Sequence, residues 1–72
     1  MNKLFENDLF IIYENLENNF IVENKHDFDI KVYLIGLDDY LEIDKNSSVY
    51  LFEGMYTECI IDCLMNESYE VL

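Results

Sequence analysis

The side chains of this 72-residue chain that can do acid–base chemistry are mostly carboxylates. The adjacent pair Asp38-Asp39 follows Gly36 in a predicted surface turn, and turn propensity accounts for both acids. General acid–base catalysis needs two groups with separated pKa values in a shielded site, which a surface turn does not offer. His26 is the only histidine, and the sequence places no serine or cysteine nucleophile beside it. We therefore assign His26 to a loop and predict no catalytic residues and no enzyme activity.

The residues that could bind a metal do not have the spacing that a metal site needs. Cys59 and Cys63 would lie about 13 Å apart on a strand, too far for a disulfide. On a helix they would share a face, but two thiols and one distant histidine make a poor zinc site. The segment that begins at Asp44 starts like a calcium loop, but it has Val49 where the EF-hand needs glycine and Met55 where it needs glutamate. We predict two buried, reduced cysteines, no metal and no cofactor.

The charge of the chain is its most unusual property. Sixteen Asp and Glu residues stand against 4 Lys and Arg, and the formal net charge is −12. The acids are spread over the whole chain, so a folded surface should be negative nearly everywhere. Such a surface repels nucleic acid and anionic lipid and attracts basic proteins. We therefore expect a basic protein partner, with no direct binding of nucleic acid and no membrane association.

Composition and hydropathy indicate a folded protein of the cytoplasm. The hydrophobic fraction of 51% is too high for a disordered chain, despite the charge. Residues 1–20 lack the pattern of a secretory signal, and no apolar run approaches the ~20 residues that cross a bilayer. The length predicts a single domain over residues 1–72.

The clearest structural pattern lies in residues 29–44, which predict two strands joined by a tight turn. Ile30, Val32 and Leu34 alternate on one face of the first strand, and Leu41 and Ile43 return to the same core. Turn residues recur roughly every ten positions, as in an all-β sandwich or barrel. Further strands are predicted over residues 9–14, 20–23, 49–52 and 69–72. We predict an all-β fold, a small antiparallel β-sandwich or barrel of about six strands.

Two segments are open to a second interpretation. Residues 3–17 have apolar side chains at helical spacing, which gives an α+β alternative with an N-terminal helix. The apolar, β-branched and aromatic run in residues 9–13 favours a strand instead. Residues 58–65 fit either a strand or a short buried helix.

The face opposite the predicted core is aromatic. It carries Tyr33, Ile35, Tyr40, Tyr50 and Phe52, whereas a sheet covered on one side only would show polar residues there. Either another element covers this face, for which the N-terminal segment is available, or the face is a binding surface.

The acidic strands suggest an electrostatic function. Carboxylates at alternate strand positions, such as Glu42 and Asp44, stand about 6–7 Å apart, and duplex DNA presents one charge per ~1.7 Å of axis. A rigid acidic surface can therefore occupy a cationic groove built for nucleic acid. As partner-binding residues we select a set with Tyr40 as anchor, because Tyr is enriched in interface hot spots. The set is Asp38, Asp39, Tyr40, Glu42 and Asp44, and Tyr33, Tyr50 and Phe52 form a second candidate interface.

A short, strongly acidic, single-domain chain of this kind resembles phage-encoded inhibitors, notably the anti-CRISPR and other DNA-mimic proteins. The likeness lies in the sixteen acids and in Tyr33, Tyr40 and Tyr50, and it spans the chain without an alignable motif. It implies a non-enzymatic inhibitor that binds the basic nucleic-acid or PAM-reading groove of a CRISPR-type defence nuclease complex in the host cytoplasm. The alternative is a self-associating structural or regulatory module, in which the aromatic face closes a homodimer.

Overall fold

Residues 1–34 and 36–72 are described by the computed structural model, and they form seven strands and one helix. In chain order these are β1 (Asn2–Glu6), β2 (Phe10–Glu14), β3 (Phe20–Asn24), β4 (Ile30–Leu34), β5 (Asp39–Ile43), β6 (Ser48–Leu51), α1 (Met55–Met65) and β7 (Glu70–Val71). Sheet A has the strand order β1-β2-β3-β6 and sheet B the order β5-β4-β7, and every neighbouring pair is antiparallel. The predicted all-β class is confirmed, with one short helix added to two open sheets.

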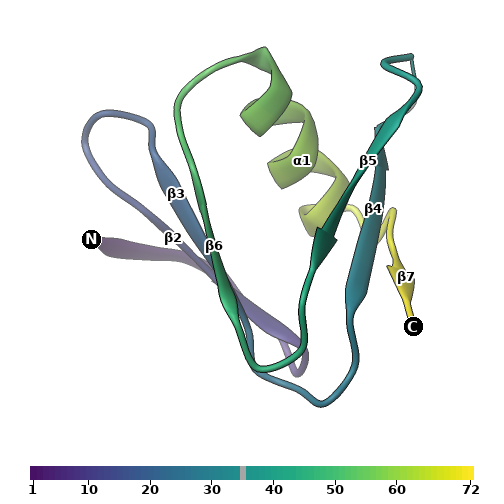
Figure 1. Cartoon of the computed structure of the whole chain (residues 1–72). Helices are drawn as coiled ribbons and strands as arrows, with labels where there is room; N and C mark the ends of the chain where they lie inside the picture. Colours follow the sequence, from purple (N-terminus) through teal and green to yellow (C-terminus); the bar gives the residue numbers. More distant parts are fainter. Residues whose placement is uncertain (35) are drawn as a thin grey trace.

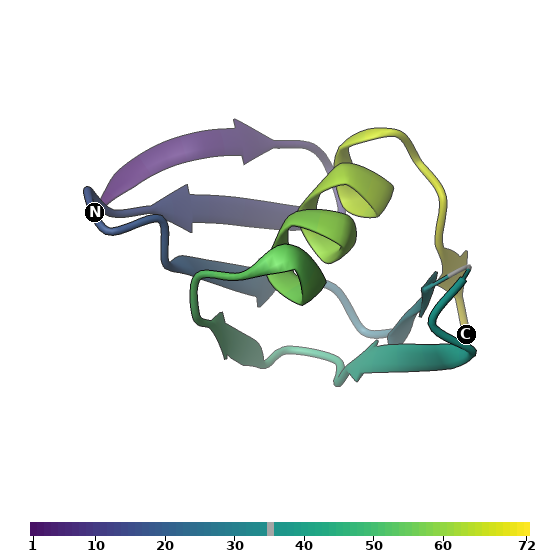
Figure 2. The same cartoon turned by 90° about the horizontal axis from the view of Figure 1, so that it is seen from above.

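The two sheets share one long hairpin that is bent in the middle (Figure 1). β3 pairs with β6 and β4 pairs with β5, so the chain runs through β3 into β4 and returns through β5 into β6. Both halves bend at the same level, within residues 25–29 and within residues 44–47. The bend gives the molecule a concave side, and α1 lies in it between the two sheets (Figures 1 and 2).

The hydrophobic core fills the space between the bent sheets and α1. The strands β2 to β6 contribute the side chains of alternate positions, and α1 contributes those of one helical face. The buried residues are Phe10, Ile12, Phe20, Val22 and Leu51 from sheet A, Ile30, Val32, Leu34 and Ile43 from sheet B, and Ile60, Ile61 and Leu64 from α1. The core positions predicted for β4 are all confirmed, and on β5 Ile43 is buried while Leu41 is half-buried.

A buried asparagine holds the bend. Asn24 is fully buried at the end of β3. Its Nδ2 donates to the carbonyl oxygens of Phe28 at 2.9 Å, Ile43 at 3.1 Å and Asp44 at 3.2 Å. Its Oδ1 accepts the backbone N–H of His26 at 3.3 Å and also contacts His26 Nδ1. One side chain therefore ties together both segments in which the hairpin bends.

The alternative of a helix over residues 3–17 is wrong. This segment forms β1, β2 and the loop that follows, because the β-branched and aromatic residues of β2 pair on both sides, with β1 and with β3. Asn15 then turns the chain: its Oδ1 accepts the backbone N–H groups of Glu17 at 2.9 Å and Asn19 at 3.1 Å. The strands predicted over residues 9–14 and 20–23 are thus confirmed as β2 and β3, which form a hairpin.

The last ambiguous segment is a helix. Gly54 precedes α1 with a φ of 148°, a backbone conformation that residues with a side chain rarely adopt. Thr57, Ile60 and Leu64 are buried at helical spacing, and the Thr57 hydroxyl donates to the carbonyl of Phe52. No helix among residues 1–34 and 36–72 is long and apolar enough to cross a membrane.

We expect the change Asn24→Ala to lower the free energy of unfolding by about 2 to 4 kcal/mol, because it leaves the buried carbonyl of Ile43 and the part-buried carbonyls of Phe28 and Asp44 without their donor. Urea denaturation followed by circular dichroism measures this change. Ser47→Ala is the matched control, since Ser47 lies in the same bend but is exposed, and its hydroxyl donates to the Lys45 carbonyl. Equal loss of stability in the two variants would contradict the role assigned to Asn24.

Candidate protein-binding surface

The five residues predicted as partner contacts lie in one strip along the β4–β5 hairpin. Asp38 lies in the turn at its tip and Asp39 begins β5. Tyr40, Glu42 and Asp44 follow at alternate positions, so their side chains share the outer face of sheet B, away from the core. All five are exposed. Asp39 lies at the parity of Leu41 and Ile43, on the opposite face of β5 from Tyr40 and Glu42. The structure therefore exposes all five residues along one hairpin, and their role in binding stays a prediction.

The aromatic residues predicted to form a single face are divided between the two sheets. Tyr33 and Tyr40 oppose each other across β4 and β5, with ring centroids 6.4 Å apart. Tyr50 and Phe52 lie in and just after β6, with centroids 5.1 Å apart. Ile35, predicted to join them, lies outside the described residues. The prediction of one continuous face is wrong, because the bend turns the outer faces of the two sheets in different directions (Figure 1).

The predicted cover from the N-terminal segment is also wrong. That segment forms β1, which extends sheet A at its edge and leaves the outer faces open. Tyr33 and Phe52 are 45% and 69% exposed, respectively. Of the two explanations for the aromatic residues, a covering element is therefore excluded for the four that the structure describes.

An open hollow of about 470 Å³ lies at the tip of the β4–β5 hairpin. It is lined by Tyr33, Leu34, Gly36, Asp38, Asp39 and Tyr40. Its walls thus combine two phenol rings with two carboxylates. Both kinds of group attract cations, the rings through their π-electrons and the carboxylates through charge and hydrogen bonding.

A lysine of the chain itself already binds to these rings. The Lys31 Nζ lies 4.1 Å from the ring centroid of Tyr40 and 5.2 Å from that of Tyr33. Glu42 and Glu70 flank Lys31 in the adjacent strands, yet within the described part of the chain Lys31 forms no ion pair. Lys31 approaches from the side of the bend, and the hollow lies on the other side, toward the tip. Sequence reasoning missed Lys31, although its place two residues before Tyr33 in a strand was visible.

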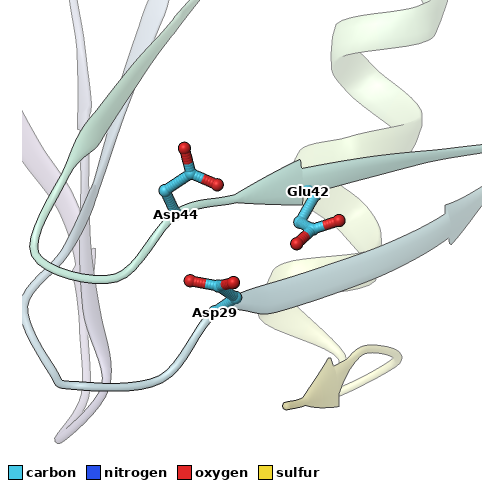
Figure 3. Close-up of side chains that lie close together, drawn as sticks. All are labelled: Asp29, Glu42 and Asp44. Carbon is cyan, nitrogen blue, oxygen red and sulfur yellow. The ribbon is translucent and has the colours of Figure 1, made fainter.

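Three carboxylates meet where sheet B reaches the bend (Figure 3). Oxygens of Asp29, Glu42 and Asp44 lie within 4.8 Å of one another. Asp29 is half-buried, and its Oδ1 accepts the backbone N–H of Lys45 at 2.8 Å, whereas the other two are exposed. Carboxylate oxygens suit hard cations, so these are the residues through which a metal ion would be held, but exposed acids alone do not define a metal site. The sequence could not show this group, because only the strand register brings Asp29 to the other two.

Two lysines near sheet A form ion pairs with the same acid, Glu6. Glu6 accepts hydrogen bonds from Lys3 at 2.8 Å and from Lys25 at 2.9 Å. These bonds hold the pKa of the Glu6 carboxyl at about 2. Two of the four lysines are thereby paired away from the β4–β5 hairpin. The acidic strip of that hairpin retains Lys31 and Lys45 as its neighbouring cations.

The other residues with reactive side chains serve the fold. His26 contacts the buried Asn24 in the bend, in agreement with its assignment to a loop. Cys59 and Cys63 are free, as predicted, but they are half-buried on α1 and not fully buried. Burial, together with the neighbouring Cys59, raises the pKa of the Cys63 thiol, whose Sγ lies 3.9 Å from the Tyr33 carbonyl oxygen. A thiol with a raised pKa is a poor nucleophile.

No protein-family model matches the chain, and no match was found among the curated proteins or the solved structures. The function is therefore argued from the chemistry of this surface.

We expect an NMR pH titration to find the pKa of the Glu6 carboxyl at about 2, below its ordinary value of 4.5. Lys25→Met removes one of the two donors and should raise this pKa, and added salt should raise it too, because the pair is exposed. Since the folded-state pKa lies below the unfolded one, the pairs stabilise the fold above about pH 4.5. That contribution is lost as the pH falls through about 2.

Lys45→Met serves as the control for this titration, because it removes a lysine that makes no contact with Glu6 in the described structure. A Glu6 pKa that responds equally to both substitutions would show that general charge, and not the hydrogen bond, sets its value.

Proposed function

We propose that the protein is a non-enzymatic inhibitor that binds the basic nucleic-acid groove of another protein through its β4–β5 hairpin. The partner class that we propose is a defence nuclease complex of the CRISPR type, bound at its nucleic-acid or PAM-reading groove. The observation that carries the proposal is the strip of Asp38, Asp39, Tyr40, Glu42 and Asp44. All five are exposed on one hairpin, beside a hollow lined by carboxylates and rings.

The charge spacing of the strip supports a mimic of one nucleic-acid strand. Asp39 and Asp44 are five residues apart, which corresponds to about 17 Å of extended chain. With Asp38, Glu42 and the adjacent Asp29 the strip carries five carboxylates, and with Lys31 and Lys45 beside them this is roughly one net negative charge per 6 Å. A duplex has one charge per ~1.7 Å, but a single strand within it has one per ~3.4 Å. The strip therefore comes closer to the charge density of a single strand.

The hairpin is also held in place before binding. The buried side chains of Ile30, Val32 and Leu34 fix β4 to the core, and α1 packs against this strand. Binding through a fixed strip loses less conformational entropy than binding through a disordered acidic tail. Tyr40 adds a large apolar contact in the middle of the strip, as expected of an anchor residue.

The hollow at the hairpin tip has the chemistry to bind a cationic side chain of the partner. A guanidinium can stack on an aromatic ring while it donates hydrogen bonds to carboxylates. Tyr33 and Tyr40 offer the rings, and Asp38 and Asp39 offer the carboxylates. Arginine is a common residue in grooves that bind phosphates, so the hollow fits the partner class that we propose.

We expect Asp39→Lys and Glu42→Lys each to weaken binding by at least about tenfold, chiefly through a slower on-rate at low salt. The partner is first captured from bacterial lysate on the immobilised protein, identified by mass spectrometry and tested for competition by its own DNA or RNA. Association rates of the purified pair are then measured at several salt concentrations. Glu17→Lys makes the same change of charge at an exposed site of the β2–β3 loop, and it should have a much smaller effect.

If Asp39→Lys and Glu42→Lys bind no more weakly than Glu17→Lys, the strip is not the contact surface. A captured partner that binds no nucleic acid would overturn the proposed mimicry.

We expect N-acetyl-arginine amide to shift the amide NMR signals of Tyr33, Asp39 and Tyr40 saturably, because these residues line the hollow. The citrulline analogue has nearly the same shape without the charge and should leave these signals unchanged. Asp39→Asn and Tyr40→Leu should each abolish the saturable shifts. Equal shifts with both compounds, or shifts spread over all acidic residues, would exclude the hollow as a cation site.

A further inference from the structure

One edge of the bent sheet lacks the charges and bulges that keep edge strands from pairing. The described residues form four edge strands, β1, β5, β6 and β7. β1 carries Lys3, Glu6 and a β-bulge, and β5 carries Asp39 and Glu42. β7 has only two residues, one of them Glu70. Charges, bulges and short length are the usual means of protecting an edge, and β6 has no charged residue and no bulge in its pairing with β3.

The sequence around β6 is equally distinct. Residues 46–52 are the longest stretch without a charged side chain in a chain that has 16 acids and 4 basic residues. This stretch also contains Tyr50 and Phe52, which are 49% and 69% exposed. An uncharged edge strand with exposed aromatic side chains is a ready site for another strand.

The backbone of β6 determines which residues can pair there. The Ser47 carbonyl accepts the backbone N–H of Asn24 at 2.8 Å, so it points toward β3. Backbone groups alternate in direction along an antiparallel strand, and those of Val49 therefore also point toward β3. The N–H and C=O groups of Ser48 and Tyr50 point to the free edge. A new antiparallel strand would hydrogen-bond to these two residues.

We propose that β6 pairs antiparallel with β6 of a second copy of this chain, with the two-fold axis at Val49. In this register Ser48 pairs with Tyr50 of the second copy, which makes about four backbone hydrogen bonds across the two-fold. The edge is thus complementary to itself in hydrogen bonding.

A second copy fits this edge because the edge is complementary to itself. An antiparallel pair of identical strands is isologous, so a single edge supplies both halves of the interface. Two chains of net charge −12 repel each other over most of their surfaces, and residues 46–52 are the longest stretch where they meet without that repulsion. The contact is small for a stable dimer, so the dimer forms in a concentration-dependent manner. This inference is independent of the proposed function, which uses β5.

The test is the mass of the chain by sedimentation velocity, from micromolar to millimolar protein at physiological salt. We expect a monomer that becomes a dimer as the concentration rises. Tyr50→Lys and Ser48→Lys place a charge beside the free edge and should each weaken dimerisation by at least about tenfold. Leu4→Lys makes a comparable change on β1, the opposite and already charged edge of sheet A, and should leave dimerisation unchanged.

Circular dichroism confirms that each variant is folded. A constant monomer mass, or a dimer unaffected by Tyr50→Lys and Ser48→Lys, would overturn the proposal.

Discussion

The hydrogen bonds of the Asn24 side chain are the constraint on which the architecture depends. Between the pairs Glu23–Ser48 and Ile30–Ile43, one half of the long hairpin has six residues, 24–29, and the other has four, 44–47. The two extra residues of the longer half can form a bend only if the buried backbone polar groups of the bend are hydrogen-bonded. Asn24 supplies them for both halves. The bend in turn creates the concave side that receives α1 and allows a core in so short a chain.

The distribution of charge follows from the same bend. The concave side is apolar, so the acids occupy the outer faces, the turns and the exposed side of α1. On sheet A, Glu6 takes two lysines, whereas on sheet B Lys31 lies over the rings of Tyr33 and Tyr40. In both arrangements the lysines leave the carboxylates of the β4–β5 hairpin exposed to solvent. The negative charge is therefore concentrated on one part of the surface and is not only a property of the whole chain.

Local patterns predicted much of this fold, because alternating side chains specify a strand and its buried face. That is why Ile30, Val32 and Leu34 are predicted correctly and why Tyr40 and Glu42 share an exposed face. Features that depend on the bend are not predictable in this way. No local pattern marks Asn24 as the residue that joins two segments, and Tyr50 is predicted on the same face as Tyr33, because the sequence does not show that the sheet changes direction between them. The hollow at the hairpin tip and the group of Asp29, Glu42 and Asp44 are not predictable either, because both depend on the register of β4 against β5.

The position of α1 after both halves of the hairpin has a consequence for the newly made chain. The pairings among the strands β1 to β6 involve no residue after Leu51. Their apolar concave side, however, stays open until residues 55–65 leave the ribosome, and β7 closes sheet B later still. A chain that stops before Met55 would hold formed sheets around an uncovered core, the kind of species that chaperones and proteases recognise. Synthesis of residues 55–71 is therefore the step that converts paired strands into a protected fold.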